Sequence, residues 1–321
     1  VTPSLFEIAL YYGFICALFE FRKTQKAKIV LFTIVLVMLG DVAYWSHKRH
    51  SRKNLTLTVL DVGQGQAVLM ELPGGECVLV DGGGFYENRF DVGERIVAPL
   101  LWRKKIATVE TLVLSHPHPD HLNGLLFVAK HFHVRELWAN RDVITSPQYQ
   151  ELLDIASRQN MVVMGPDKLT THRTIGGVGF QVLYPPTDFL ERKKDDPWRT
   201  TNNNSLVLKV TWGHISLLLP GDIEAKGEQE LVTLAGAALK SDVLVVPHHG
   251  SKTSSTAAFL RHVDPAVAVI SAGKNSPSGL PHKNVLKRYD SRGCRIMRTD
   301  LQGAITLMTD GIHVTAKPYL R

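Results

Sequence analysis

Three histidines and one aspartate within six residues constrain the fold of this chain more than any other feature of its sequence. The apolar segment 111–115 is typical of a buried strand, and it leads directly into His116, His118, Asp120 and His121. A loop at the end of a strand can direct all four side chains toward one point. Neutral imidazoles and carboxylates are ligands of Zn²⁺ and similar ions, so the cluster predicts a divalent metal site. A chance cluster of surface histidines is the alternative.

Two further apolar segments end in residues of the same kinds. Asp222 follows residues 217–219, and His248 and His249 follow residues 243–246. An aspartate at the end of a strand is by itself more often a helix cap. Together with the first cluster, these residues provide enough ligands for two divalent ions that share a carboxylate, an arrangement that activates water for hydrolysis.

Around these clusters, the hydrophobic pattern predicts short strands and helices in mixed order. The expected strands are 55–61, 66–72, 77–81, 111–115, 134–139, 161–164, 180–184, 205–212, 215–220, 242–247, 266–271, 295–298, 304–309 and 312–315. The expected helices are 93–105, 122–131, 147–160, 224–234, 256–262 and 284–291. Two sets of strands with helices between them suit an α/β fold of two sheets packed face to face with helices outside. The long polar segment 185–204 is typical of an active-site loop.

The first 53 residues differ from the rest of the chain. Leu5–Phe21 and Ile29–Trp45 are apolar runs of 17 residues each. As helices they would each cover roughly 25 Å, at the short end for a membrane span. We expect residues 1–53 to form two transmembrane helices and residues 54–321 to form a separate domain. Two buried helices of a soluble domain are the alternative, which the acidic residues within the runs favour.

The distribution of charge fits this division. The chain carries 37 Lys and Arg against 30 Asp and Glu, a formal net charge of +7. Eight of these basic and three of these acidic side chains lie in residues 1–53, where they would meet lipid headgroups. Residues 54–321 have a net charge of only +2, so charge alone does not identify a nucleic-acid-binding domain. The three cysteines lie too far apart for a disulfide framework or a zinc–thiolate cluster.

Six segments make the sequence similar to a known family. They are LDVGQGQA at 60–67, VDGG at 80–83, HPHPDH at 116–121, NNNSL at 202–206, LPGDIE at 219–224 and VPHHGSKTSS at 246–255. HxHxDH with a later aspartate and histidine resembles the metallo-β-lactamase fold, an αββα sandwich of metal-dependent hydrolases. The whole combination more closely resembles the C-terminal domain of the ComEC family, the channel proteins of DNA uptake. This resemblance covers nearly all of residues 55–315, and the apolar runs would match the last helices of the channel domain.

The resemblance implies a role for each metal ligand. The first ion would be bound by His116 and His118, the second by Asp120 and His121, and both by Asp222. Either His248 or His249 would complete the second site, and the sequence leaves that choice open. The third histidine that usually binds the first ion is missing between His121 and Asp222. Both ions would be Zn²⁺ or Mn²⁺, and the first ion would therefore be short of a ligand.

Further residues take roles that the resemblance implies. Asp81 would orient the metal loop by hydrogen bonds. Asp120 and His282 would be catalytic, with His282 protonating a leaving group or holding a phosphate. A solvated histidine at the start of a helix is the alternative for His282. Substrate contacts are expected from Asn204, Ser205, Ser251 and Lys252, of which the last two lie in a stretch that is also suited to helix capping. Gln66 stands where the family often has aspartate.

The function that follows is that of a nuclease which degrades the DNA strand that is not transported. Single-stranded DNA, the membrane and other parts of the DNA-uptake machinery are the expected partners, and the oligomeric state stays open. The resemblance places the chain in the bacterial plasma membrane, with the hydrolase domain on the outer face. Two alternatives remain: a non-catalytic, metal-stabilised docking module at the channel mouth, and a hydrolase of the same fold that acts on a small ester.

Overall fold

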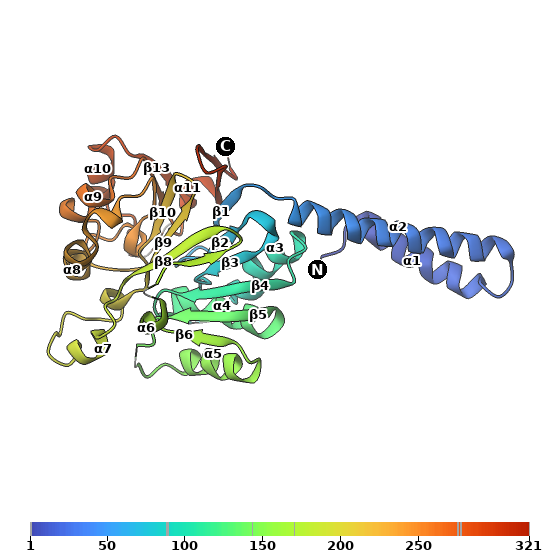
Figure 1. Cartoon of the computed structure of the whole chain (residues 1–321), viewed down its shortest axis with the longest axis horizontal. Helices are drawn as coiled ribbons and strands as arrows, with labels where there is room; N and C mark the ends of the chain where they lie inside the picture. The colour runs from blue at the N-terminus through green and yellow to red at the C-terminus, as the bar shows by residue number, and fades with distance from the viewer. Residues whose placement is uncertain are drawn as a thin grey trace.

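The computed structural model describes residues 2–87, 90–142, 144–169, 171–274, 276 and 278–320, which form two β-sheets (Figure 1). The first sheet has, in spatial order, strands β15 (Val314–Pro318), β14 (Ile305–Thr309), β1 (Leu55–Val59), β2 (Val68–Glu71), β3 (Cys77–Val80), β4 (Thr108–Leu114), β5 (His133–Ala139) and β6 (Val162–Met164). The second has β13 (Arg295–Arg298), β12 (Val267–Ile270), β11 (Val243–Val245), β10 (Ile215–Leu219), β9 (Val207–Trp212), β8 (Val178–Tyr184) and β7 (Arg173–Ile175).

Three cores of buried apolar side chains arrange these elements in layers. One core joins the two sheets and includes Val113 and Val245. Another, with Leu112 and Leu125, lies between the first sheet and its helices, and a third, with Phe259, lies on the outer face of the second sheet. The covering helices are α3 (Ala98–Arg103), α4 (Pro119–His131) and α5 (Pro147–Arg158) on the first sheet, and α8 (Ala225–Ala235), α9 (Ala257–Val263) and α10 (Lys283–Asp290) on the second. The predicted αββα sandwich is confirmed.

The parallel parts of the two sheets explain how distant ligands come together. Strands β3, β4, β5 and β6 are parallel neighbours, and so are β10, β11, β12 and β13. Carboxyl ends of parallel strands lie at one edge of a sheet, where binding sites of α/β folds are usual. Asp81 follows β3, His116 follows β4, Asp222 follows β10 and His249 follows β11. The strand order therefore gathers residues that are far apart in the sequence.

Helix α4 begins earlier than expected, and this changes the local setting of the first cluster. Pro119 occupies the first turn and His118 is the N-cap, so Asp120 and His121 lie in the helix rather than in a loop. The helix approaches the end of β3 very closely, because a Cβ on Gly124 would lie 2.0 Å from the carbonyl oxygen of Gly82. Glycine at both positions lets α4 carry two candidate ligands against the sheet.

The closing hairpin also differs from the expectation. Thr309 pairs with Val314, so the connection includes residues 310–313 rather than a two-residue turn. Asp310 Oδ1 accepts hydrogen bonds from the backbone N–H groups of Ile312 (2.9 Å) and His313 (2.8 Å). This local turn holds both residues outside the second strand. The polar segment 185–204 also contains short helical turns, α7 (Phe189–Arg192) and residues 202–204.

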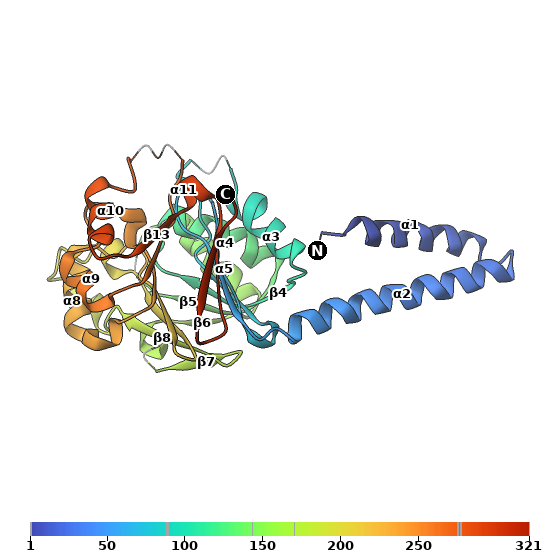
Figure 2. The same ribbon diagram turned by 90° about the horizontal axis from the view of Figure 1, so that it is seen from above.

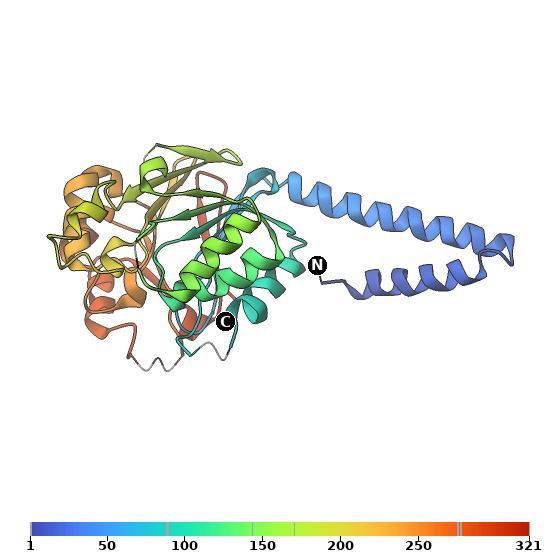
Figure 3. The ribbon, with the colours of Figure 1, turned by 90° about the horizontal axis from the view of Figure 1, so that it is seen from below.

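Two N-terminal helices extend away from the sheets as a hairpin (Figures 2 and 3). They are α1 (Leu5–Glu20) and α2 (Gln25–His50). Within the described residues, α2 alone is long and apolar enough to cross a membrane, with 26 residues and a mean hydropathy of 2.0 in its most apolar part. Its apolar side chains are largely exposed, with Phe32 at 64% and Leu39 at 61%. A membrane span is thus consistent with α2, and a second one in α1 stays a prediction.

Candidate metal centre

Asp81 is the anchor of the site. It is completely buried after β3, and its backbone has φ of 58°, an uncommon conformation for a residue with a side chain. Its carboxylate accepts hydrogen bonds from Ser115 N (2.7 Å), Ser115 Oγ (2.8 Å), His121 Nδ1 (2.8 Å) and Gln66 Nε2 (3.1 Å). A carboxylate only accepts, so the proton of His121 lies on Nδ1, and a neutral His121 directs an unprotonated Nε2 into the site.

The same reasoning orients His116. Ser115 Oγ donates its hydrogen to Asp81, so it accepts one from His116 Nδ1 at 3.1 Å. The other nitrogen, His116 Nε2, is buried and has no hydrogen-bond partner among the described residues. It lies 4.0 Å from Asp222 Oδ2. A buried nitrogen with a free lone pair, aimed at a carboxylate, fits a metal ligand.

A compact group of four side chains forms around His249. Its Nδ1 donates to the backbone carbonyl of Ser271 at 3.0 Å, which leaves Nε2 as the acceptor nitrogen. That Nε2 lies 3.3 Å from His121 Nε2, 3.5 Å from Asp222 Oδ2 and 3.7 Å from Asp120 Oδ2. Ligand atoms of Asp120, His121, Asp222 and His249 all lie within 4.8 Å of one another. We call these four residues the Asp120 set, and they fit one divalent cation.

His248 faces a different point. Its Nε2 lies 3.8 Å from Asp222 Oδ2, the oxygen that His116 Nε2 also approaches. On its other side, Nδ1 lies 3.5 Å from Glu224 Oε1 and 3.2 Å from Thr253 Oγ1. With His118, whose ring centroid is 4.8 Å from that of His116, these residues form a second group, which we call the His116 set: His116, His118, Asp222 and His248. Asp222 belongs to both sets.

The backbone explains why two adjacent histidines diverge. His248 and His249 have φ values of 50° and 53°, in the left-handed region that few residues with side chains adopt. Their ring planes differ by 74° and the ring centroids are 6.3 Å apart. The tight turn at Pro247–Gly250 therefore presents one imidazole to each set. Sequence reasoning assigned a single histidine of this pair to the second ion and missed this arrangement.

The electrostatics of the Asp120 set favour a positive charge at its centre. Burial would raise the pKa of Asp222, but the imidazoles of His121 and His249 hold it well below its usual range. Burial would lower the pKa of His121, but the carboxylates of Asp222 and Asp81 hold it well above its usual range. Binding of a divalent cation would release that proton. Burial and the neighbouring His121 lower the pKa of His116, which keeps its imidazole neutral, as a metal ligand must be.

The expected substrate-contact residues occupy different environments. Asn204 and Ser205 are completely buried, and Ser205 Oγ accepts a hydrogen bond from the backbone N–H of Asp222 at 3.0 Å. Ser251 is 9% exposed and its Oγ lies 3.0 Å from Thr253 Oγ1. Lys252 is exposed beside the turn Pro247–Gly250, which we call the histidine turn. Of these residues Lys252 is the most accessible to a substrate, whereas Ser205 positions a candidate ligand.

His282 acts as a helix cap in this structure. Its Nδ1 accepts a hydrogen bond from the backbone N–H of Asn284 at 3.2 Å, at the start of α10. Its own backbone N–H donates to the carbonyl of Gly250 at 2.9 Å, so the residue lies next to the histidine turn. The catalytic role of His282 stays a prediction.

Sequence reasoning missed the residues that orient the imidazoles. Ser115, Ser271 and Glu224 each contact a candidate ligand, and all three are common residue types with no spacing of their own. Ser115 had a signal in its position between the buried strand and the first histidine, and Glu224 had one as the last residue of the LPGDIE segment. The side-chain amide of Gln66 donates a hydrogen bond to Asp81, so the residue at this position has a structural role that requires no negative charge.

The sequence is similar to several known proteins. The family model of the metallo-beta-lactamase superfamily matches residues 60–274. ComE operon protein 3 of Bacillus subtilis (strain 168) is 33% identical over 258 residues, which are 77% of this chain and 32% of that protein. Competence protein ComA of Neisseria gonorrhoeae is 32% identical over 271 residues, which are 84% of this chain and 34% of that protein. The chain thus spans about a third of the length of these curated relatives.

A solved structure shows the same fold. The CmlA beta-hydroxylase E377D mutant superimposes with a TM-score of 0.51 at 15% sequence identity, over 79% of this chain and 54% of that chain. At this identity the likeness shows the fold alone.

Proposed function

The chain belongs to the metallo-β-lactamase superfamily and is homologous to competence proteins of the ComEC family, and we propose that it is the nuclease part of a DNA-uptake membrane protein. Its reaction would be hydrolysis of phosphodiester bonds in the DNA strand that is not transported. The observation that carries this proposal is the pair of ligand sets that share Asp222, because two adjacent divalent ions suit phosphodiester hydrolysis.

Different residues of the site would have different roles in such a reaction. Two bound divalent ions would supply an activated water and would offset the charge on the phosphoryl oxygens. Asp81 fixes the orientation of His121, and Ser205 holds the backbone of Asp222. Asp120 belongs to the HxHxDH motif and to the Asp120 set. Its side chain is 12% exposed, so a substrate can approach it and it can accept a proton there. The exposed side chain of Lys252 can contact a phosphate of the DNA backbone.

We assign His248 to the first ion and His249 to the second. This assignment supplies the first ion with the third imidazole that the sequence lacks elsewhere. Replacing either histidine with alanine is therefore expected to lower the bound metal from two ions to about one per chain, measured by elemental mass spectrometry after dialysis. His262→Ala is the control, because that imidazole is exposed on α9, where it hydrogen-bonds the carbonyl of Ala258, and belongs to neither ligand set. Two ions retained by His248→Ala would contradict the assignment.

The test of the proposed activity uses the full chain in detergent. We expect cleavage of single-stranded DNA in the presence of Mn²⁺ or Zn²⁺ and no cleavage after treatment with EDTA. His118→Ala is expected to lower the rate by at least about 10-fold, because the loss of one imidazole weakens binding of the first ion. An absence of cleavage with either metal, or an unchanged rate for His118→Ala, would rule the activity out.

The membrane location is part of the same proposal. Helix α2 is long enough to span a bilayer, and its last turn carries His47, Lys48, Arg49 and His50. Lys48 lies over the ring of Trp45 at 4.8 Å, an aromatic and basic pair typical of a membrane interface. We infer that α2 crosses the bacterial plasma membrane and holds the hydrolase domain close to it. The outer face is the side that the family resemblance implies, because basic residues flank both ends of α2 and favour neither side.

A further inference from the structure

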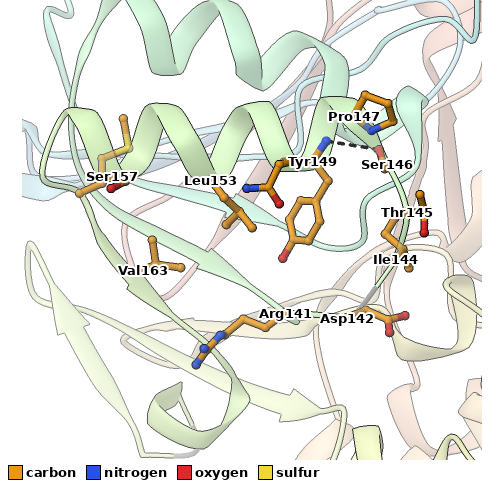
Figure 4. A pocket seen from close by; sticks show the side chains of 12 residues that line it. Arg141, Asp142, Ile144, Thr145, Ser146, Pro147, Tyr149, Leu153, Ser157 and Val163 are labelled. Atoms are coloured by element: carbon orange, nitrogen blue, oxygen red, sulfur yellow. Dashed lines mark hydrogen bonds between the residues drawn. The ribbon is translucent and has the colours of Figure 1, made fainter.

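A pocket of about 950 Å³ lies next to the carboxyl end of β5, the strand adjacent to β4, and none of the roles assigned above uses it. It lies between α5, the segment that follows β5 and the strand β6 (Figure 4). Ile144, Leu153, Met161 and Val163 contribute an apolar floor, whereas Arg141, Tyr149 and Gln150 contribute polar groups.

The position of the pocket follows from strand register. Leu114 of β4 pairs with Ala139 of β5, and Trp138 of β5 pairs with Met164 of β6. Arg141 therefore leaves the sheet one strand away from His116, at a distance of roughly 5 Å between strands. The phosphates of one strand follow one another about every 3.4 Å along the axis of a DNA duplex, and they lie further apart in an extended unpaired strand. Arg141, at one end of the pocket, thus lies within a short stretch of unpaired strand from the metal centre.

Tyr149 is the clearest sign of an unassigned ligand. The residue is 5% exposed, and its hydroxyl has no hydrogen-bond partner among the described residues. Figure 4 shows this hydroxyl directed from α5 into the pocket toward Arg141. A buried hydroxyl without a partner is costly, so a ligand that accepts its hydrogen bond would recover that cost. Burial raises the pKa of Tyr149 to about 12, which keeps the hydroxyl a donor at neutral pH.

The guanidinium of Arg141 is available to bind an anion. Its backbone has φ of 58°, and its aliphatic stem packs on Gly165, where a Cβ would lie 2.5 Å from Arg141 Cδ. The nearest carboxylate, Asp167 Oδ1, is 3.9 Å from its guanidinium, and both side chains are 54% exposed, so water screens this pair. The neighbouring Asp142 is neutralised by Lys193 at 2.6 Å.

We infer that this pocket binds one unpaired nucleotide of the DNA strand next to the scissile phosphate. The base lies on the apolar floor, its edge or phosphate accepts the hydrogen of Tyr149, and the phosphate pairs with Arg141. A paired base cannot enter such a pocket, so the pocket selects single strands. This inference rests on the proposed nuclease function and specifies its substrate as unpaired polynucleotide.

The test measures binding rather than cleavage. Fluorescence anisotropy of a labelled ten-nucleotide single strand is recorded with the full chain in detergent and EDTA. Arg141→Ala is expected to weaken binding about tenfold and to lower the slope of log affinity against log salt by about 0.7. Tyr149→Phe is expected to weaken binding about threefold without changing that slope, and to leave the thermal stability the same or higher, because it removes one hydroxyl that has no partner in the described structure. Arg135→Ala, exposed at the opposite end of β5, is the matched control.

The outcomes separate this inference from the proposed function. Wild-type affinity in both pocket variants, an equal loss in Arg135→Ala, or equal competition by a duplex of the same length would overturn it. Absence of binding by the wild-type chain would overturn it too. If the chain cleaves DNA and the pocket variants bind normally, only the subsite is refuted. If no cleavage occurs and binding still depends on Arg141 and Tyr149, the subsite stands and the nuclease proposal fails.

Discussion

Replacing Asp222 with alanine is expected to lower DNA cleavage by at least 100-fold, beyond the roughly 10–100-fold that loss of an outer hydrogen-bond partner costs at metal sites. The reason is that Asp222 contributes to both ligand sets, with Oδ2 lying 3.5 Å from His249 Nε2 and 4.0 Å from His116 Nε2. Bound metal is expected to fall below one ion per chain. Single-turnover cleavage assays and elemental mass spectrometry measure the two effects.

Two further variants serve as comparisons for Asp222→Ala. Asp222→Asn keeps the size of the side chain and removes its charge, so it is expected to lose metal as the alanine variant does. Asp290→Ala removes an exposed carboxylate at the end of α10 and is expected to change neither quantity. Two ions bound by Asp222→Ala would show that this carboxylate is not shared between the sets.

Asp81→Asn is expected to destabilise the fold itself by about 3 kcal/mol or more. Asp81 is completely buried and accepts four hydrogen bonds, from two groups of Ser115 and from His121 and Gln66. An amide of the same size offers one oxygen and one NH₂ group. If the NH₂ group replaces Oδ2, the three buried donors Ser115 Oγ, His121 Nδ1 and Gln66 Nε2 lose their acceptor, and if it replaces Oδ1, the backbone N–H of Ser115 does. The free energy of unfolding, measured by urea denaturation in EDTA, reports this loss without any contribution from bound metal.

A surface substitution and a metal titration complete this experiment. Asp290→Asn is the control and is expected to stay within about 0.5 kcal/mol of the wild-type free energy of unfolding. Asp81→Asn should also weaken metal binding about 10–100-fold, since His121 loses the partner that fixes its tautomer. Wild-type stability in EDTA would show that the hydrogen bonds of Asp81 do not stabilise the fold.

The candidate metal centre was predictable in its residues and less so in its geometry. His116, His118, Asp120 and His121 are recognisable because they follow a buried strand at a spacing that metal sites use. Their orienting partners were not recognisable, because Ser115 and Ser271 are common residues whose role comes from one contact each. The start of α4 was misjudged by three residues, since a proline in the first turn places Asp120 and His121 inside the helix.

The pocket next to α5 could not be predicted from the sequence, for a similar reason. Tyr149 and Leu153 have the spacing of an ordinary amphipathic helix, and Arg141 is one of many surface arginines. Only the tertiary structure shows that these side chains line one pocket, and the register of β4 and β5 places Arg141 one strand away from His116.

The sequence by itself determined the layered α/β fold and the kinds of ligand, because hydrophobic periodicity and residue chemistry are local properties. The tertiary structure decided how those ligands are shared. His248 and His249 are adjacent in the chain, yet left-handed backbone conformations and partners at Glu224 and Ser271 direct their imidazoles to different sets. Such a division depends on contacts between residues far apart in the chain, such as His121 and His249, which are 128 positions apart, and no local pattern encodes it.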